Sequence, residues 1–249
     1  MKVAFQLAVM FGLLSLAACN DRTADRVQVE RDVYNAFVAQ VEQVRNERFR
    51  ELSEELFLEF SIGFCNMVAK GDAARSDIAV VIDYSKPSNE ERWKILDLKN
   101  LMVESSSLVA HGRNTGELRA NRFSNLTNSK KTSLGFFATG ETYTGKHGYS
   151  LKLEGLELNL NSNARKRAIV VHGADYVSKE FIRKNGRLGR SWGCPALPQV
   201  VAVSLIDKVK DGACLYSHGK YQRKQSSSDL RLVSRVTITT FQRIFANNR

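Results

Sequence analysis

The segment GRLGRSWGCPALP, from Gly186 to Pro198, has the residue types of a cysteine nucleophile on a tight turn. A thiol attacks as its thiolate, and an ordinary pKa of about 8.5 means that a base or a nearby positive charge must activate it at neutral pH. Gly193 lets the backbone approach closely, and Pro195 stiffens the chain after the cysteine. Backbone N–H groups at such a turn can stabilise an oxyanion. Cys194 is therefore either a nucleophile or a small buried residue with rigid neighbours.

A nucleophilic Cys194 needs a base, and His172 is the best-placed of the four histidines. It ends the apolar run RAIVVHG and is followed by a glycine, so its ring can reach a surface shared with other segments. Arg187 and Arg190 add positive charge close to Cys194 in the sequence. We assign no role to His111 or His218.

The elements that must position these residues are mainly short strands. The runs IAVVIDYS, WKILDLKNLMVESSSLVAHG, YSLKLEGLELNL, RAIVVHG and ACLYS are typical of strands, the second of them of a hairpin. Helical spacing is found at residues 177–184 and in VVAVSLIDKVKDG. From Val33 to Phe60 apolar residues recur every three or four positions, which predicts one or two amphipathic helices that pack on the domain or bind a partner or a membrane. Many strands with few helices favour a mainly β fold, a β-sandwich or small barrel.

The first residues have the pattern of a secretory signal. Lys2 precedes an apolar run over 3–16, which is shorter than the about 20 residues of a membrane-spanning helix. The sequence LAAC that follows resembles a bacterial lipobox, in which the cysteine sulfur receives a diacylglycerol. We expect residues 1–18 to be a lipoprotein signal peptide and Cys19 to be the lipidated residue. The alternative is an ordinary secretory signal with an incidental cysteine.

These patterns predict five parts of the chain. They are a signal peptide (1–18), a polar tether (19–32), a helical N-terminal segment (33–70), a catalytic domain (72–218) and a basic C-terminal extension (219–249). We expect this extension to be a partly disordered appendage in which LVSRVTITTFQRIF can form an extra strand or an interfacial helix. A lipid anchor would hold the protein on the periplasmic face of the inner or outer membrane of a bacterial cell envelope.

The net charge indicates which partners the protein can attract, and the cysteine count indicates whether a free thiol is present. The net charge is +11, and a basic surface attracts polyanions. For an exported protein we expect anionic phospholipid or the acidic wall polymer, and no nucleic acid; simple solubility is the alternative. Beyond Cys19, the odd number formed by Cys65, Cys194 and Cys214 indicates at least one free thiol. A Cys65–Cys214 bridge stays open, and no spacing indicates a metal site or cofactor.

The stretch HGADYVSKEFIRKNGRLGRSWGCPALP resembles the catalytic segment of the L,D-transpeptidases of bacterial cell-wall synthesis. It is most similar to the divergent branch described as the murein L,D-transpeptidase catalytic domain family, relatives of the YkuD domain. The blocks DYSKPSNEERWKILDL, LVAHGRNTGE, RFSN and TSLGFFATGETYTGKHGYSLKLEGLE share this resemblance in the same order, so that it covers about residues 78–217.

The resemblance implies a β-sandwich-like domain whose cysteine attacks the amide between the diamino acid and D-Ala of a peptidoglycan stem. D-Ala leaves, and an amine from another stem or from a wall-attached protein resolves the thioester. The matching nucleophile is Cys194 and the matching base is His172, oriented by the Gly173 carbonyl. Ser191 and Gly193 match the Ser-x-Gly-Cys motif.

Departures from the family pattern concern the residues around the cysteine. Trp192 stands where histidine is common, and Ala196 stands where an arginine or asparagine is common. We expect Arg190 to meet that second role, and both Arg190 and Trp192 to contact substrate.

A second candidate group is Tyr143, Lys146 and His147, in TYTGKHGYS. These residues either line the donor groove or contact the stem carboxylate, or they form an ordinary polar loop. If His147 serves Cys194, then His172 is not the base.

The acceptor is a separate question. Water in place of an amine would make the protein an L,D-carboxypeptidase or endopeptidase. A non-catalytic cell-wall-binding lipoprotein is the remaining alternative.

Overall fold

The computed structural model describes residues 28–220 and 232–246 of the chain. The expected signal peptide, Cys19 and part of the basic extension lie outside the described residues. The chain divides after Gln43 into two units. Residues 28–48 are helical, and this helix includes the end of the segment expected as a tether. In the described residues, no helix combines the length and the hydropathy that crossing a membrane requires.

An eight-stranded mixed sheet is the scaffold of the second unit, with the strand order β3-β2-β1-β8-β4-β5-β6-β7. The β1–β8 and β6–β7 pairs are parallel, and the other pairs are antiparallel. The prediction of a mainly β domain behind a helical segment is confirmed. The strands are β1 (Ile78–Asp83), β2 (Trp93–Asp97), β3 (Met102–Ser107), β4 (Gly135–Gly145), β5 (Gly148–Gly155), β6 (Val170–Ala174), β7 (Ala196–Pro198) and β8 (Cys214–His218).

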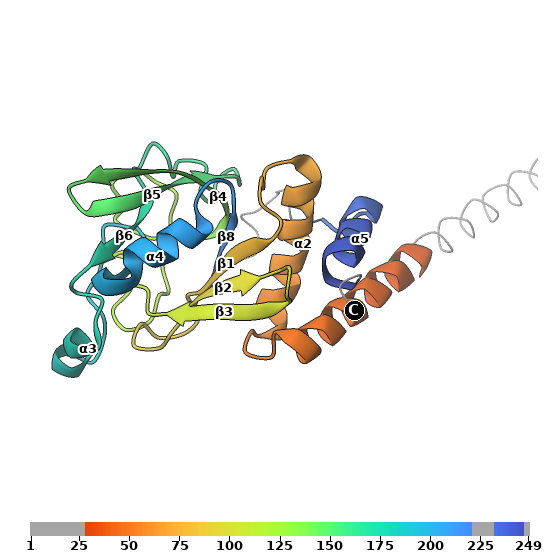
Figure 1. Cartoon of the computed structure of the whole chain (residues 1–249), viewed down its shortest axis with the longest axis horizontal. Helices are drawn as coiled ribbons and strands as arrows, with labels where there is room; N and C mark the ends of the chain where they lie inside the picture. The colour runs from red at the N-terminus through yellow and green to blue at the C-terminus, as the bar shows by residue number, and fades with distance from the viewer. Residues whose placement is uncertain (1–27, 221–231, 247–249) are drawn as a thin grey trace, which may run out of the picture. The chain divides into compact units, whose positions relative to one another are not determined.

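Five further helical elements accompany the sheet. They are α2 (Glu54–Lys70), α3 (Lys179–Asn185), α4 (Gln199–Val209), α5 (Arg235–Phe241) and a short π-helix η3 (Gln242–Ala246). Figure 1 shows α4 lying across the sheet near β5 and β6, and α2 beside β1 and β8. The regular 3.6-residue spacing of apolar side chains in α4 explains its position, because Ala202, Leu205, Ile206 and Val209 all enter the main core.

Helix α2 begins and ends where its sequence provides caps. The Ser53 side chain accepts a hydrogen bond from the N–H of Leu56, and Gly71 adopts a left-handed conformation at the C-terminus. Residues 235–246 of the basic extension are helical and pack on α2. Phe245 of η3 meets Phe57 and Phe64 of α2 edge to face.

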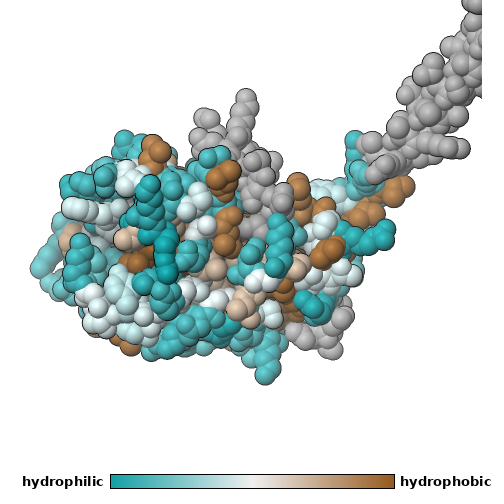
Figure 2. All heavy atoms as spheres, turned by 90° about the horizontal axis from the view of Figure 1, so that it is seen from above, coloured by the Kyte–Doolittle hydropathy of each residue, from teal (hydrophilic) through white to brown (hydrophobic). Residues whose placement is uncertain are grey.

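A polar contact accompanies this aromatic packing. The Thr237 hydroxyl of α5 donates to Asn66 Oδ1 of α2 at 2.7 Å, and Asn66 Nδ2 donates to the Leu232 carbonyl oxygen at 2.8 Å. On the face shown in Figure 2, hydrophobic residues of the sheet domain form separate small areas among hydrophilic ones.

Candidate active site

The sheet places His172 on the strand next to β7, which follows the turn that contains Cys194. His172 lies in the middle of β6, and β7 begins two residues after Cys194. The parallel register pairs His172 with Ala196, and the His172 N–H lies 3.4 Å from the Pro195 carbonyl oxygen. A separation of 22 positions in the sequence therefore becomes a contact between adjacent backbones.

The His172 ring has one nitrogen committed to the backbone. Nδ1 lies 2.8 Å from the Gly173 carbonyl oxygen, and because a carbonyl only accepts, Nδ1 carries the proton. This contact is the one that the family resemblance implies. Burial lowers the pKa of His172, the Gly173 carbonyl raises it, and His147 and Lys146 lower it further. The imidazole is thus kept neutral with Nε2 free to accept a proton.

The Cys194 side chain is half-buried, and its sulfur lies 3.7 Å from the Ala168 carbonyl oxygen, to which the thiol donates. Burial raises the pKa of Cys194. The Val170 N–H and the positive charges of Arg167 and Lys146 act in the opposite direction. A thiol in this environment needs a base to reach its reactive form.

Ser191 and Gly193 shape the turn that presents Cys194. The Ser191 hydroxyl donates to the Cys194 carbonyl oxygen at 2.6 Å and accepts from the Gly193 N–H at 3.0 Å. Gly193 has φ +127°, a conformation that side chains rarely adopt. The Gly193 N–H is therefore committed to Ser191, although the sequence suggested that amides of this turn bind an oxyanion.

The tip of the β4–β5 hairpin lies against His172. The His147 ring lies on the His172 ring, with centroids 4.5 Å apart and planes 21° apart. Lys146 acts electrostatically on both Cys194 and His172. Tyr143 lies on the same hairpin, where the Lys152 ammonium sits 5.4 Å above its ring. The structure thus brings His147 and Lys146 to the cysteine–histidine pair and packs Tyr143 along the hairpin.

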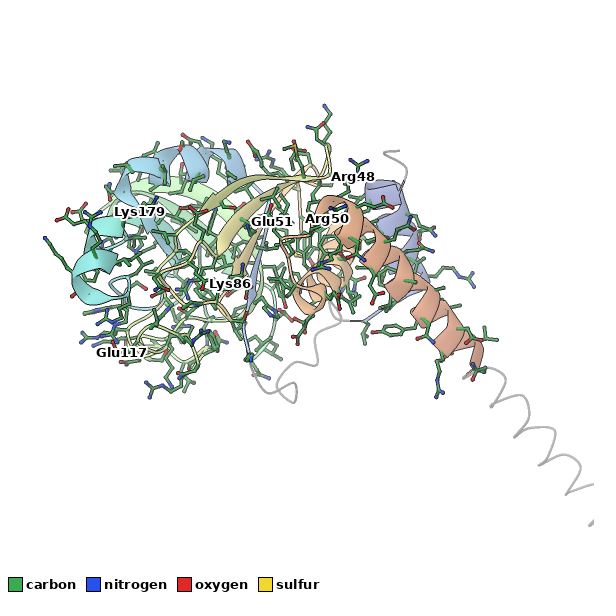
Figure 3. The ribbon with its side chains drawn as sticks, turned by 90° about the horizontal axis from the view of Figure 1, so that it is seen from below. Arg48, Arg50, Glu51, Lys86, Glu117 and Lys179 are labelled. Atoms are coloured by element: carbon green, nitrogen blue, oxygen red, sulfur yellow. The ribbon has the colours of Figure 1, made fainter. Side chains whose placement is uncertain are left out.

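Arg190 and Trp192 face different surroundings. The Arg190 guanidinium pairs with Glu117 and donates to the carbonyl oxygens of Arg113 and Gly116. Glu117, labelled in Figure 3, also pairs with Arg187 at 3.0 Å, near the end of α3. Arg190 is therefore engaged in holding a loop.

Trp192 is 67% exposed, and the Lys130 ammonium lies 4.5 Å from the centre of its ring. This cation–π pair lies at the turn that contains Cys194.

The sequence indicated no role for the buried residues Arg92 and His111, which contact each other near the Cys194 turn. Arg92 donates from Nη2 to His111 Nδ1 at 2.8 Å and from Nε to the Val109 carbonyl oxygen at 3.0 Å. The His111 backbone carbonyl in turn accepts the Ser191 N–H at 3.0 Å. His111 thus holds the turn that contains Cys194 through its backbone carbonyl, a role that its position between loop residues in the sequence did not indicate.

Other titratable groups lie away from this site. Cys65 and Cys214 are buried and free, so the bridge left open by the sequence is not formed in this structure. His218 lies 3.2 Å from Glu59 of α2. Within the described part of the chain, no group of three or more histidine, cysteine, aspartate or glutamate side chains could hold a metal ion.

The family model for the L,D-transpeptidase catalytic domain matches residues 49–218. The chain belongs to this family. No curated protein matches the sequence.

Among solved structures, similar ones include an L,D-transpeptidase from Mycobacterium smegmatis (12% identity, TM-score 0.37) and L,D-transpeptidase 3 from Mycobacterium tuberculosis (11%, 0.38). A third is the L,D-transpeptidase of Xylanimonas cellulosilytica (18%, 0.34). Each match covers 57% of this chain, and 59%, 61% and 61% of the respective neighbours. The chain thus spans about three fifths of the length of these structures.

Proposed function

We propose that the protein is a peptidoglycan L,D-transpeptidase with Cys194 as its nucleophile. One observation carries the proposal: a neutral His172, with its Nδ1 proton held by Gly173, lies on the strand next to the turn that presents Cys194. A thiol that must be deprotonated, beside an imidazole with a free Nε2, is an acyl-transfer arrangement.

The proposed reaction forms a thioester on Cys194 and releases D-Ala. His172 Nε2 takes the Cys194 thiol proton, and the sulfur attacks the carbonyl carbon of the diamino acid–D-Ala amide in a stem tetrapeptide. The C–N bond breaks, the imidazolium returns the proton to the leaving amine, and D-Ala departs. The thioester then acylates an amine of a second stem or of a wall-attached protein, and the acceptor's proton passes through His172.

Positive and aromatic side chains around the sulfur support substrate binding. The D-Ala of a tetrapeptide ends in a free carboxylate, Lys146 brings positive charge close to Cys194, and the His147 ring with its N–H donor lies on the His172 ring. We assign the donor's carboxylate to Lys146 and His147, and the stem's apolar surface to Trp192 with Lys130. Tyr143 and Arg190 would then act at the margins, Arg190 by holding the loop that contains Glu117.

Intact-protein mass spectrometry with a stem tetrapeptide or a carbapenem tests the nucleophile. The parent should gain the mass of the acyl group, and Cys194→Ala should not. Cys65→Ala is the matched control, because it removes a buried thiol of α2 away from Cys194 and should still be acylated. Acylation of folded Cys194→Ala would refute the mechanism.

Digestion of isolated peptidoglycan treated with the enzyme, followed by mass analysis, tests the acceptor. Cross-linked dimers that increase with added amine acceptor support a transpeptidase. Trimmed monomers alone would make water the acceptor, and the protein a carboxypeptidase or endopeptidase. Binding to isolated sacculi without acylation would indicate a wall-binding lipoprotein.

The anchor is a proposal from the sequence. We infer that Cys19 carries a diacylglycerol that holds the protein on the periplasmic side of an envelope membrane. Labelling with a fatty-acid analogue should modify the parent and not Cys19→Ser; equal labelling of both would exclude Cys19 as the lipidated residue.

A further inference from the structure

Arg167, just before β6, is a half-buried cation without a carboxylate partner among the residues that the structure describes. Four of its five N–H donors are used on uncharged oxygens of the segment 124–133. Nη1 donates to the Ser124 carbonyl oxygen at 2.8 Å and to the Ser133 hydroxyl, and Nη2 donates to the Ser129 hydroxyl at 3.2 Å and to the Lys131 carbonyl oxygen.

These hydrogen bonds hold the segment 124–133 against the turn formed by Ser191–Cys194, called the nucleophile turn below. A Cβ placed on Gly193 would lie 2.9 Å from the Lys131 carbonyl oxygen and 3.2 Å from Arg167 Nη2. Thr132, in the same segment, donates from its hydroxyl to the Gly193 carbonyl oxygen at 3.3 Å. The guanidinium, the segment and the turn are therefore in mutual contact.

The residue after Arg167 touches the sulfur itself. The Ala168 carbonyl oxygen accepts from the Cys194 thiol at 3.7 Å, and Ala168 is held at φ +52°. A non-glycine residue in this left-handed conformation is strained, and the surrounding contacts must offset that strain. Residues 167 and 168 thus reach the nucleophile from the same short stretch, one by charge and one by a backbone carbonyl.

Burial lowers the pKa of Arg167, and a sulfur anion at Cys194 raises it. Reciprocally, Arg167 lowers the pKa of the Cys194 thiol against the opposing effect of burial. An uncompensated cation held in a half-buried position stabilises whatever anion forms beside it.

We propose that Arg167 is the positioning residue of the nucleophile: its guanidinium clamps the segment 124–133 onto the turn at Gly193 and supplies the positive charge that opposes the Cys194 sulfur anion. The proposal rests on the proposed function of Cys194. It also gives Arg167, and not the Glu117-bound Arg190, the electrostatic role beside the sulfur.

Other groups that face Cys194 define how the effect can be isolated. Lys146 is the second cation, but it is exposed on the hairpin tip, where solvent and salt screen its charge. Burial raises the pKa of both Tyr84 and Tyr176, so these phenols are uncharged at neutral pH. His172 is also neutral there, for the reasons given above. Arg167 is therefore the least screened charge near the sulfur.

The test measures the thiol pKa from the pH dependence of Cys194 alkylation by iodoacetamide, with the modified residue located by peptide mass. In Arg167→Gln the thiol pKa should rise by about one unit, and alkylation at pH 7 should slow about tenfold. Arg167→Lys keeps the charge and should recover most of that rate. Arg165→Gln is the matched control, since Arg165 pairs with Glu141 and Glu154 at the surface and should leave the thiol unchanged.

Folding is checked by circular dichroism and thermal unfolding. The proposal is overturned if the thiol pKa of folded Arg167→Gln equals that of the parent protein. It is also overturned if the thiol pKa rises as much in Arg167→Lys as in Arg167→Gln. If Arg167→Gln does not fold, Arg167→Lys is the deciding variant. A thiol pKa equal to that of the parent protein, together with slower acylation, supports the proposal. A raised thiol pKa, or acylation as fast as in the parent protein, overturns it. Alkylation by iodoacetamide needs no wall substrate. If the parent protein is alkylated at Cys194 but never acylated, that result contradicts the proposed function and not the role of Arg167.

Discussion

The imidazole of His147 lies flat on the imidazole of His172, with ring centroids 4.5 Å apart. His147 comes from the tip of the β4–β5 hairpin, while His172 belongs to β6, whose residue 172 pairs with Ser150 of β5. The hairpin tip therefore folds back over His172, the proposed base. Positive charge on His147 opposes protonation of His172, which favours the neutral imidazole that base catalysis needs.

Replacing His147 by alanine should shift the pH profile of acylation. Without His147 the pKa of His172 rises, because burial still lowers it but one repelling charge is gone. Neutral His172 then exists only at higher pH, so the acid limb of the rate of carbapenem acylation should move upward. The rate at the plateau should fall less than in His172→Ala, where loss of a general base costs about 10²–10⁴-fold.

His218→Ala is the control for this profile, since His218 contacts Glu59 of α2 and has no part in the stack. If His147→Ala instead removes activity as completely as His172→Ala at every pH, then His147 is itself the base for Cys194.

Removing the Ser191 hydroxyl should loosen the nucleophile turn. In Ser191→Ala the Gly193 N–H and the Cys194 carbonyl oxygen both lose their partner in a buried turn, a cost of about 1–3 kcal/mol for an unsatisfied group. We expect a lower midpoint of thermal unfolding and slower acylation. Ser191→Thr keeps the hydroxyl and should restore most of both.

Ser204→Ala gives the matched surface comparison. The Ser204 hydroxyl lies on the exposed face of α4 and donates to the Val201 carbonyl oxygen. Equal effects of Ser191→Ala and Ser204→Ala would show that the Ser191 bonds do not hold the turn.

Gly193 and Gly186 separate backbone strain from steric contact. Both have positive φ, +127° and +71°, but a Cβ on Gly186 meets no atom within 4 Å, whereas one on Gly193 meets Lys131 at 2.9 Å. Gly186→Ala should cost about 1 kcal/mol of unfolding free energy and leave acylation unchanged. Gly193→Ala should cost about 1–3 kcal/mol and slow acylation strongly. Parent-like acylation by Gly193→Ala would contradict the close packing of this turn.

The sequence allowed the strands to be predicted because they depend on local patterns, whereas the catalytic roles of Cys194 and His172 stay predictions. The apolar run RAIVVHG predicted a strand ending at His172, and the structure forms β6 over Val170–Ala174 with His172 in its middle. Arg167 could not be recognised in the same way. In the basic stretch NARKR it is indistinguishable from its neighbour Arg165, and only the fold brings the segment 124–133 across one of them.

The fate of the C-terminal extension was equally hidden. Its basic composition indicated an appendage, yet residues 235–246 pack on α2 through Phe241 and Phe245. Two aromatic residues in a polar tail carry little periodic signal, and their value depends on the apolar face that α2 offers.

Stability should fall in mild acid because of His111. Burial lowers the pKa of His111 to about 4, with the charge of Arg92 adding to the effect. Arg92 donates to Nδ1, so the neutral ring carries its proton on Nε2, which donates to the Gly116 carbonyl oxygen at 3.2 Å. In the unfolded chain His111 takes up a proton near pH 6.5, while in the folded protein it does not.

The unfolded state therefore binds more protons between pH 6.5 and about 4, and the free energy of unfolding falls as the pH is lowered through this window, by up to about 3 kcal/mol. Urea unfolding at pH 7, 6 and 5 measures the slope. His111→Gln should reduce the slope, because glutamine does not titrate, and the slope that remains includes the effect of His172, whose pKa burial also lowers. The substitution should also lower stability at pH 7 through imperfect contacts with Arg92 and Gly116. The acidic groups at Asp77, Asp97 and Asp207 have lowered pKa values and titrate below this range. An unchanged slope in His111→Gln would mean that His111 is not held neutral in the folded protein.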